Sequence, residues 1–185
     1  DLFKQELAAF VDKHKAGTVF GNNLHNKYVK NSTRVLNATT EAELQKFNAL
    51  VGLFEKHAGT YDFDHLMLMA QGYQESQLNQ AARSPRGALG IMQLLPSTAA
   101  DPVVGIRGID KSADKNIEAG SKYMRVLADK YLNDPELTPM NRTLLSFAAY
   151  NAGPGNLRKF RRLAEKSGLD KNVWFGNVEH SAARV

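Results

Sequence analysis

The chain has 185 residues, of which 43% are hydrophobic and 23% are charged; this composition suits one globular domain and excludes a disordered or fibrous protein. The absence of cysteine excludes disulfides, thiolate metal sites and thiol nucleophiles. The net charge of +5 would suit an anionic polymer, but the basic residues are spread along the chain, and their densest group, within residues 158–162, fits the solvated face of a helix.

The first 40 residues are predicted to be a connector that precedes a globular domain at 41–185. Apolar residues at helical spacing predict a helix that ends near Gly17: Phe3, Leu7, Phe10 and Val11. The stretch from Gly17 to Asn37 is rich in Gly, Asn, Lys and Ser, which favours a linker or an irregular arm. No run is apolar enough to span a bilayer, residues 1–6 do not resemble a signal peptide, and a start without Met favours a processed or excised chain.

Two helices are predicted between residues 40 and 76. Thr40 followed by Glu43 is a capping-box signature, and it predicts a helix that closes before Gly59 and has four regularly spaced apolar residues: Leu44, Phe47, Val51 and Phe54. Asp62 is predicted to cap the next helix, which carries Glu75 near its C-terminal end. The apolar stripe of this second helix is expected to be Leu66, Met69, Ala70 and Tyr73.

A long loop and a third helix follow. Residues 78–96 are rich in Gly, Pro, Ser and Gln, which is typical of a loop and leaves room for a short β-hairpin in the 80s. Ser112 or Asp114 is predicted to start a helix that stops at residues 133–135, and Gly120 within it would let another backbone come close. Its buried face is expected to contain Ile117, Gly120, Met124, Leu127 and Tyr131.

Two more helices complete the predicted elements. Thr138 followed by Pro139 is an N-cap with proline at the first helical position, and it opens a helix that reaches Tyr150. Residues 151–155 break the chain, and a last helix closed by Gly168 contains Leu157, Phe160, Leu163 and Ala164. Because no segment alternates like a strand, the fold is expected to be mainly α.

Glu75 is the first candidate for chemistry, because it follows an apolar helix face and no other carboxylate occurs between residues 76 and 100. Burial raises the pKa of a carboxyl group, as a general acid requires. The alternative is an exposed glutamate at a helix end, which is the commoner situation for a glutamate. The five histidines lack the spacing of a helix-borne zinc site, so no metal and no other cofactor is expected.

Three short motifs resemble those of the family 1 lytic transglycosylases. They are Glu75-Ser76, the Gly-Ala-Leu-Gly-Ile-Met-Gln stretch at 87–93, and the Ala-Tyr-Asn-Ala-Gly stretch at 149–153. Their order and spacing match as well as their residues, and the resemblance covers about residues 61–160, including an Asn116-Ile117 pair with Gly120 and Tyr123. The stretch from Asp1 to His57, together with Trp174-Phe175 and Val178-Glu179, is most similar to the subgroup of membrane-bound lytic murein transglycosylases F.

The resemblance implies a goose-lysozyme-like domain of the lysozyme superfamily at 41–185, with a long cleft for alternating N-acetylglucosamine (GlcNAc) and N-acetylmuramic acid (MurNAc). It implies that Glu75 is the acid and base, and that Ser84 lies near this acid or near the substrate acetamide. It also implies that Gln93 and the backbone around Met92 line the cleft. For the Met92 side chain, plain packing is an equal alternative.

The third motif supplies two further candidates. The resemblance implies that Tyr150 directs its hydroxyl toward the acid, and that Asn151 shapes the turn or contacts sugar. For Ala149, packing is again an equal alternative. Two departures from the family pattern are a leucine, Leu95, where many members have methionine, and the absence of the closing Glu-Thr and Tyr-Val helix, so the domain is expected to be truncated at its C-terminal end.

The implied reaction cleaves the MurNAc-GlcNAc β-1,4 bond with one glutamate and leaves 1,6-anhydro-MurNAc ends. A lysozyme-type hydrolase that recruits Asp101, Asp110 or Asp114 as a second carboxylate is an alternative, and so is a non-catalytic peptidoglycan-binding module. Nucleic acid is not expected as a partner, because no stacking-aromatic pattern or known motif accompanies the positive charge.

The implied partner is therefore the glycan strand of peptidoglycan. The resemblance implies a monomeric enzyme of the bacterial periplasm, attached to the outer membrane through regions absent from this chain, with further domains in the full-length protein. The chain itself is expected to contain no transmembrane segment.

Overall fold

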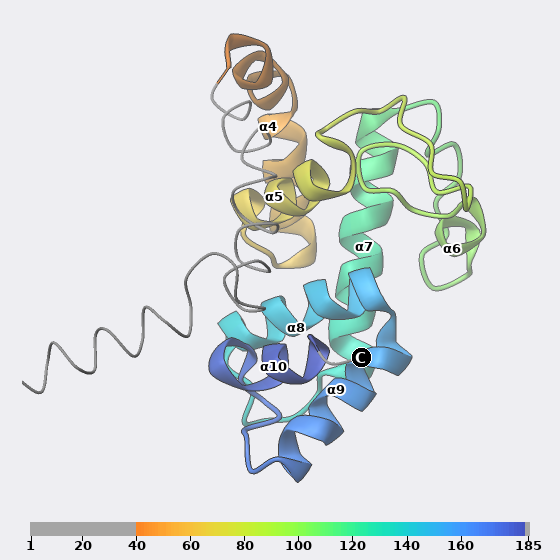
Figure 1. The fold of residues 1–185 in the computed structure, drawn as a ribbon. Coiled ribbons are helices and arrows are strands. Elements are labelled where there is room, and N and C mark those ends of the chain that lie inside the picture. Colours follow the sequence, from red (N-terminus) through yellow and green to blue (C-terminus); the bar gives the residue numbers. More distant parts are fainter. Residues whose placement is uncertain (1–39, 184–185) are drawn as a thin grey trace, which may run out of the picture. The chain divides into compact units, whose positions relative to one another are not determined.

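The computed structural model of the protein describes residues 40–183, so the helix and arm expected before Asn37 lie outside the described residues. The chain divides into two compact units, 1–49 and 50–185, and the first is described only at its end, as the first turns of one helix. The helices are α4 (Glu41–Tyr61), α5 (His65–Ser76), α6 (Pro96–Ala100), α7 (Ala113–Tyr131), α8 (Pro139–Ala152), α9 (Pro154–Lys166) and α10 (Glu179–Ala182), and an irregular turn η2 (Trp174–Val178) precedes α10 (Figure 1).

The expected mainly α fold is confirmed. Residues 40–183 contain no β-strand, and in place of a hairpin the loop at 77–95 has two isolated antiparallel bridges, which join Leu89 to Arg83 and to Leu94. None of the helices in this part of the chain is both long enough and apolar enough to cross a membrane.

The start of α5 differs from the prediction. Asp62 does not cap it, because Asp62 has a left-handed backbone (φ 58°) and turns the chain after α4, which continues through Gly59 to Tyr61. Asp64 has the extended backbone of an N-cap instead, and its side chain accepts a hydrogen bond of 2.9 Å from the backbone N–H of Met67.

The buried face of α5 is also rotated from the predicted stripe. Leu66 is 52% exposed, and the buried residues are Leu68, Met69, Gln71 and Gly72. Gly72 belongs to this face because the side chains of Ile91 and Phe54 lie 3.0 Å from where its Cβ would be. A glycine and a glutamine do not contribute to the hydrophobic pattern, so this pattern alone predicts the wrong buried face of the helix.

The predictions for α7 are confirmed in most respects. Ser112 is its N-cap, and the helix ends at Tyr131, before the predicted stop. The predicted face is buried at Ile117, Gly120, Met124 and Leu127. The close neighbour of Gly120, however, is the side chain of Met92 rather than another backbone.

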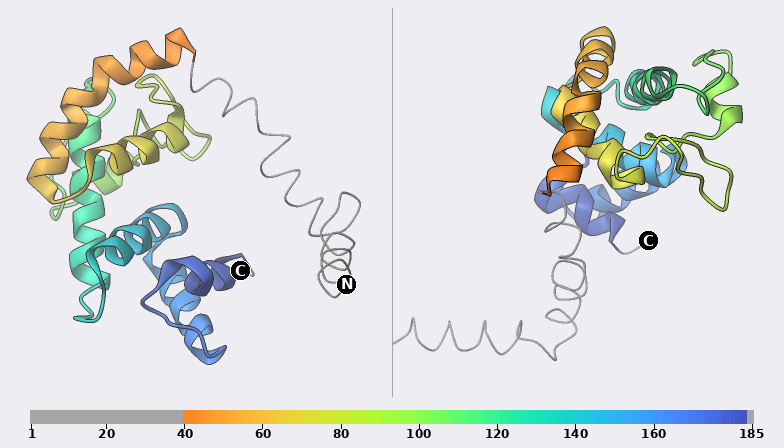
Figure 2. Two further views of the ribbon diagram at one scale, coloured as in Figure 1. Left: turned by 90° about the vertical axis from the view of Figure 1, so that its left-hand side faces the viewer. Right: turned by 90° about the horizontal axis from the view of Figure 1, so that it is seen from above.

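The C-terminal helices pack around a cluster of buried apolar residues. Thr138 caps α8, whose break at Gly153 (φ 85°) leads directly into α9. The helix α8 packs against α7 and α9, and α9 packs against α10 (Figure 2). Their buried apolar residues form one cluster, which includes Leu127, Leu145, Leu157, Phe160 and Val178. The elements η2 and α10 have no counterpart among the predicted elements, because both are shorter than the window in which helical periodicity can be recognised.

The contact between Gly120 and Met92 is testable. A Cβ on Gly120 would lie 2.7 Å from both Cβ and Cγ of Met92, atoms close to the backbone that cannot easily move away. We therefore expect Gly120→Ala to lower the free energy of unfolding by about 1–3 kcal/mol through overpacking, although alanine is the better helix former. Urea denaturation of the purified chain would measure the change.

Gly52→Ala is the matched control, because Gly52 lies inside α4 with no atom within 4 Å of the added Cβ. This substitution should raise the free energy of unfolding by about 0.5–1 kcal/mol. Equal stabilisation by both substitutions would contradict the inferred packing of α7 on Met92.

Candidate active site

Glu75 lies in the last turn of α5. The helix ends one residue later because Gln77 adopts a left-handed backbone (φ 55°), and the N–H of Gln77 closes on the carbonyls of Gly72 and Tyr73. Glu75 is about half-buried, and this burial raises the pKa of its carboxyl group above the ordinary value. A hydrogen bond from Gln71 opposes this effect in part. The sequence-based expectation of a raised pKa through burial therefore agrees with the structure.

Gln71 and Asn151 complete a short hydrogen-bonded chain at Glu75. The amide nitrogen Nε2 of Gln71 donates to Glu75 Oε1 at 2.7 Å and to Asn151 Oδ1 at 2.9 Å. Two of the three residues were candidates from the sequence, and Gln71 was missed. Its position four residues before Glu75 places both side chains on one face of the helix, and this spacing is the signal that could have identified it.

The loop at 77–95 is anchored from two helices. At the end of α5, the hydroxyl of Ser76 donates to the carbonyl of Ile91 at 2.9 Å. In α7, the side-chain carbonyl of Asn116 accepts from the N–H of Met92 at 2.7 Å, and its amide nitrogen donates to the carbonyl of Leu89 at 2.9 Å. From the sequence, Asn116 was assigned only to a family-like helix. Its position four residues before Gly120, on the same helix face, is the signal that could have indicated its role in holding the loop.

Tyr150 anchors the same loop from α8. Its hydroxyl donates to the carbonyl of Met92 at 2.7 Å and forms no hydrogen bond with Glu75 in the described part of the chain, so its orientation toward the acid stays a prediction. Burial is the main cause that raises the pKa of Tyr150 well above its ordinary value, and the nearby Glu75 and Tyr123 raise it further. The phenol therefore stays neutral. The Tyr123 and Tyr150 rings meet edge to face, with centroids 5.5 Å apart.

The other candidates support the loop. Ser84 closes a turn with Ala88 through two hydrogen bonds. The N–H of Ser84 donates to the carbonyl of Ala88 at 2.9 Å, and the N–H of Ala88 donates to the hydroxyl oxygen of Ser84 at 3.0 Å. Gln93 has a left-handed backbone (φ 45°), and its amide nitrogen donates to the carbonyl of Gly90 at 2.8 Å. The Met92 side chain has no exposed surface, so of the two roles left open for it, packing is the one it can have here.

Two of the three alternative second carboxylates, Asp101 and Asp114, have other partners. Asp114 accepts a 2.7 Å hydrogen bond from His57 and pairs with Lys56 at 3.0 Å, and these two contacts lower the pKa of Asp114. Asp101 accepts from the backbone N–H of Val103 at 3.0 Å. In the part of the chain that the structure describes, no carboxylate hydrogen-bonds to Glu75, and no group of three or more His, Asp or Glu side chains could hold a metal ion.

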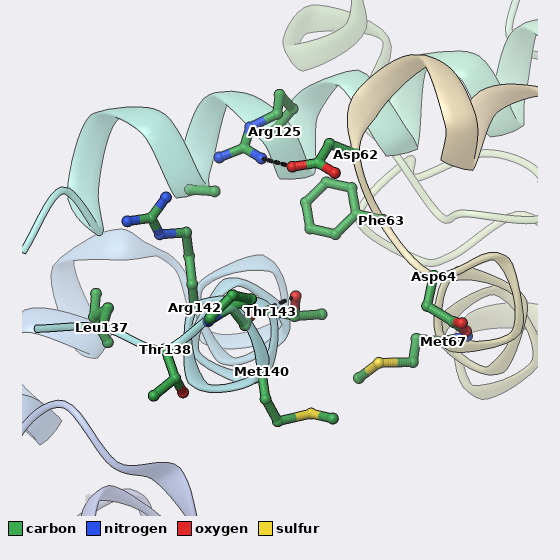
Figure 3. Close-up of a pocket in the computed structure, with 12 residues that line it drawn as sticks. Asp62, Phe63, Asp64, Met67, Arg125, Leu137, Thr138, Met140, Arg142 and Thr143 are labelled. Atoms are coloured by element: carbon green, nitrogen blue, oxygen red, sulfur yellow. Dashed lines mark hydrogen bonds and ion pairs between the residues drawn. The ribbon is translucent and has the colours of Figure 1, made fainter. Parts of the chain in front are cut away.

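A cavity of about 690 Å³ lies at the opposite ends of the helices that carry the candidate residues (Figure 3). It is lined by Asp64 and Met67 from the beginning of α5 and by Met140 from the beginning of α8. Glu75 is eight residues beyond Met67, which corresponds to about 12 Å along a helix. None of the residues that line this cavity belongs to the motif set, so we place the candidate site at the C-terminal end of α5 instead.

The chain is similar to known proteins over most of its length. The sequence pattern of the family described as "Transglycosylase SLT domain" matches residues 52–173. The membrane-bound lytic murein transglycosylase F of Shewanella sp. (strain W3-18-1) is 34% identical over an alignment of 180 residues that covers 94% of this chain and 36% of the relative. A protein of the same name from Thiobacillus denitrificans is 32% identical over an alignment of 176 residues that covers 93% of this chain and 36% of the relative. The chain thus spans about a third of the length of these relatives.

The bond from Tyr150 to Met92 can be tested by Tyr150→Phe. This substitution leaves the carbonyl of Met92 without its donor and keeps the ring, so the free energy of unfolding should fall by about 1–2 kcal/mol. Tyr73→Phe is the matched control on α5, because the hydroxyl of Tyr73 is buried without a partner among the described residues. Its removal should leave the stability unchanged or raise it. Equal losses in the two variants, measured by urea denaturation, would argue against the anchoring role of Tyr150.

Proposed function

Because the chain belongs to the family of transglycosylase SLT domains, we propose that it cleaves the glycan strands of peptidoglycan as a lytic transglycosylase, with Glu75 as its single acid and base. The family has the lysozyme-like fold, in agreement with the fold class expected from the sequence. The observation that carries the proposal is the half-buried carboxyl of Glu75 with a raised pKa at the end of α5, inside the first of the three family-like motifs.

The proposed reaction has two proton transfers through one carboxyl group. Glu75 first protonates the oxygen of the MurNAc-GlcNAc β-1,4 bond, so that the bond from this oxygen to C1 of MurNAc breaks and the GlcNAc hydroxyl leaves. The N-acetyl carbonyl of MurNAc stabilises the cation at C1. The Glu75 carboxylate then takes the proton of the C6 hydroxyl, whose oxygen bonds to C1. The product has a 1,6-anhydro-MurNAc end, Glu75 is again protonated, and no water is consumed.

Burial of Glu75 supports its role as the initial acid, because the raised pKa keeps a larger fraction of the carboxyl protonated toward neutral pH. The intramolecular C6 hydroxyl is a nucleophile held next to C1, which gives it an advantage over a free water molecule. The single carboxyl group is therefore sufficient for both steps.

A lysozyme-type hydrolase is the alternative reaction on this fold, and it would need a second carboxylate roughly 5–10 Å from the first. The bonds of Asp114 to His57 and Lys56, and of Asp101 to the backbone of Val103, favour the transglycosylase. A non-catalytic binding module would gain nothing from a carboxyl group that is costly to bury, so the environment of Glu75 also favours an enzyme.

Substrate contacts are proposed for the residues around Glu75. Asn151 is exposed, and its Oδ1 is used by Gln71, while its amide nitrogen has no partner among the described residues and can donate to a sugar. Ser84 and Gln93 belong to the anchored loop that would form one wall of the glycan cleft, and Met92 contributes its backbone there.

We further propose that the enzyme acts in the bacterial periplasm, where peptidoglycan lies, and that the full-length protein is attached to the outer membrane through regions outside this chain. The names of the relatives describe membrane-bound murein transglycosylases, and the relatives are longer than this chain, which favours additional domains. A monomer suffices for the proposed chemistry, because all of the proposed site residues belong to one chain.

Glu75→Gln tests the proposed acid. The substitution is nearly isosteric and removes the proton donor, so release of anhydro-muropeptides from purified sacculi should fall by about 10³-fold or more, while the melting temperature and glycan binding are retained. Glu55→Gln, in an exposed position of α4, is the matched control and should keep full activity. Mass spectrometry of the products provides the measurement. Substantial anhydro-product release by Glu75→Gln would exclude Glu75 as the acid, and reducing ends from the unmodified protein would indicate a hydrolase.

A further inference from the structure

Gln71 is a buried polar residue whose bonds all lead toward the candidate site. It is 6% exposed and lies one helical turn before Glu75. An amide nitrogen has two hydrogens, and Gln71 Nε2 has two acceptors, Glu75 Oε1 at 2.7 Å and Asn151 Oδ1 at 2.9 Å. The side chain thus joins the end of α5, which carries the acid, to the end of α8, which carries Asn151.

We propose that Gln71 is a positioning residue, which holds Glu75 by Oε1 against Asn151 and leaves Oε2 as the oxygen that carries the proton toward the glycosidic bond. This inference rests on the proposed function of Glu75. It deepens that function by assigning different tasks to the two oxygens of one carboxyl group.

The two oxygens of Glu75 have different surroundings. Oε1 accepts the hydrogen bond from Gln71, whereas Oε2 accepts none from the described residues and is not among their buried atoms that lack a partner, so it retains contact with solvent. A proton on Oε1 would compete with the N–H of Gln71 for the same oxygen. The protonated form therefore carries its hydrogen on Oε2, the side from which a substrate can approach.

The same bond is compatible with both steps of the reaction. A neutral carboxyl group can accept the Gln71 N–H through its carbonyl oxygen, and the carboxylate accepts it more strongly because the bond is then charge-assisted. The bond accordingly lowers the pKa of Glu75 against the larger opposing effect of burial. The acid remains available for the first step, and its conjugate base is stabilised for the second.

The other groups near Glu75 do not replace this contribution. Tyr150 is the titratable neighbour, and it is neutral and bonded to Met92. Within residues 40–183, no lysine, arginine or histidine forms an ion pair with Glu75, and no charged side chain is among the causes of its pKa shift. Gln71 is thus the one described side chain that adjusts the acid through a direct bond.

Gln71→Met tests the proposal, because methionine fills a similar volume on a helix and has no N–H to donate. Gln74→Met is the matched control, since Gln74 lies on the same helix, is exposed, and makes no hydrogen bond to the described residues. The pKa of Glu75 is read by NMR titration of protein with 13C-labelled glutamate, and the spectrum of Glu75→Gln assigns the signal. The pH dependence of anhydro-product release is measured in parallel.

In Gln71→Met we expect a higher pKa of Glu75, since burial then acts without the opposing hydrogen bond. Activity requires the protonated acid and falls as pH rises through its pKa, so the alkaline limb of the pH profile should move to higher pH. The maximal rate should fall about tenfold, because the acid is less well oriented and its conjugate base is less stabilised. Gln74→Met should match the unmodified protein in all three measurements.

An unchanged pKa of Glu75 in Gln71→Met, with a lower melting temperature, would overturn the proposal and leave Gln71 as a link between two helices. Gln71→Leu, which is close in volume and has no hydrogen-bond donor, takes the place of Gln71→Met if the latter does not fold, and an unchanged or lower pKa of Glu75 in it would overturn the proposal too. The titration does not depend on catalysis. An active Glu75→Gln variant would therefore refute the proposed function without affecting the measured link between Gln71 and Glu75.

Discussion

The buried side chain of Asn116 holds the long loop between α5 and α6 in place. Its carbonyl accepts the N–H of Met92, and its amide nitrogen donates to the carbonyls of Leu89 and Ile109, so each of its polar atoms has a partner. Gly90 has no side chain because a Cβ there would lie 2.3 Å from the amide nitrogen of Asn116. An unpaired buried amide or carbonyl costs about 1–3 kcal/mol, and this cost disfavours any other path for the loop.

The same loop is bound by residues of two further helices, Ser76 of α5 and Tyr150 of α8. With Met92 held by Asn116, the carbonyl of Met92 is in place to accept the hydroxyl of Tyr150, and the neighbouring carbonyl of Ile91 accepts the hydroxyl of Ser76. Three helices, α5, α7 and α8, are thereby connected to one stretch of four residues at 89–92. Glu75 lies one residue before the anchoring Ser76, and burial raises the pKa of its carboxyl group.

Much of the fold could be predicted because its signals are local. The caps at Ser112 and Thr138, the stop after Tyr131 and the break at Gly153 depend on residues within one or two turns of each helix end. The buried face of α5 could not be predicted in this way. Gly72 lies on that face because Phe54 and Ile91, which come from other segments of the chain, pack against it. The cap of α5 also moved from Asp62 to Asp64, because the turn after α4 requires a left-handed residue at the earlier position.

The sequence by itself determined the helical class, the family-like motifs and the identity of the candidate acid, because these properties depend on residue type and spacing along the chain. Only the tertiary structure decided what each candidate contacts: the Tyr150 hydroxyl bonds to Met92, the Met92 side chain is buried, and Gln71 joins Glu75 to Asn151. Hydrogen bonds between residues 58 or 80 positions apart depend on how the helices pack, and no local pattern in the chain encodes that packing.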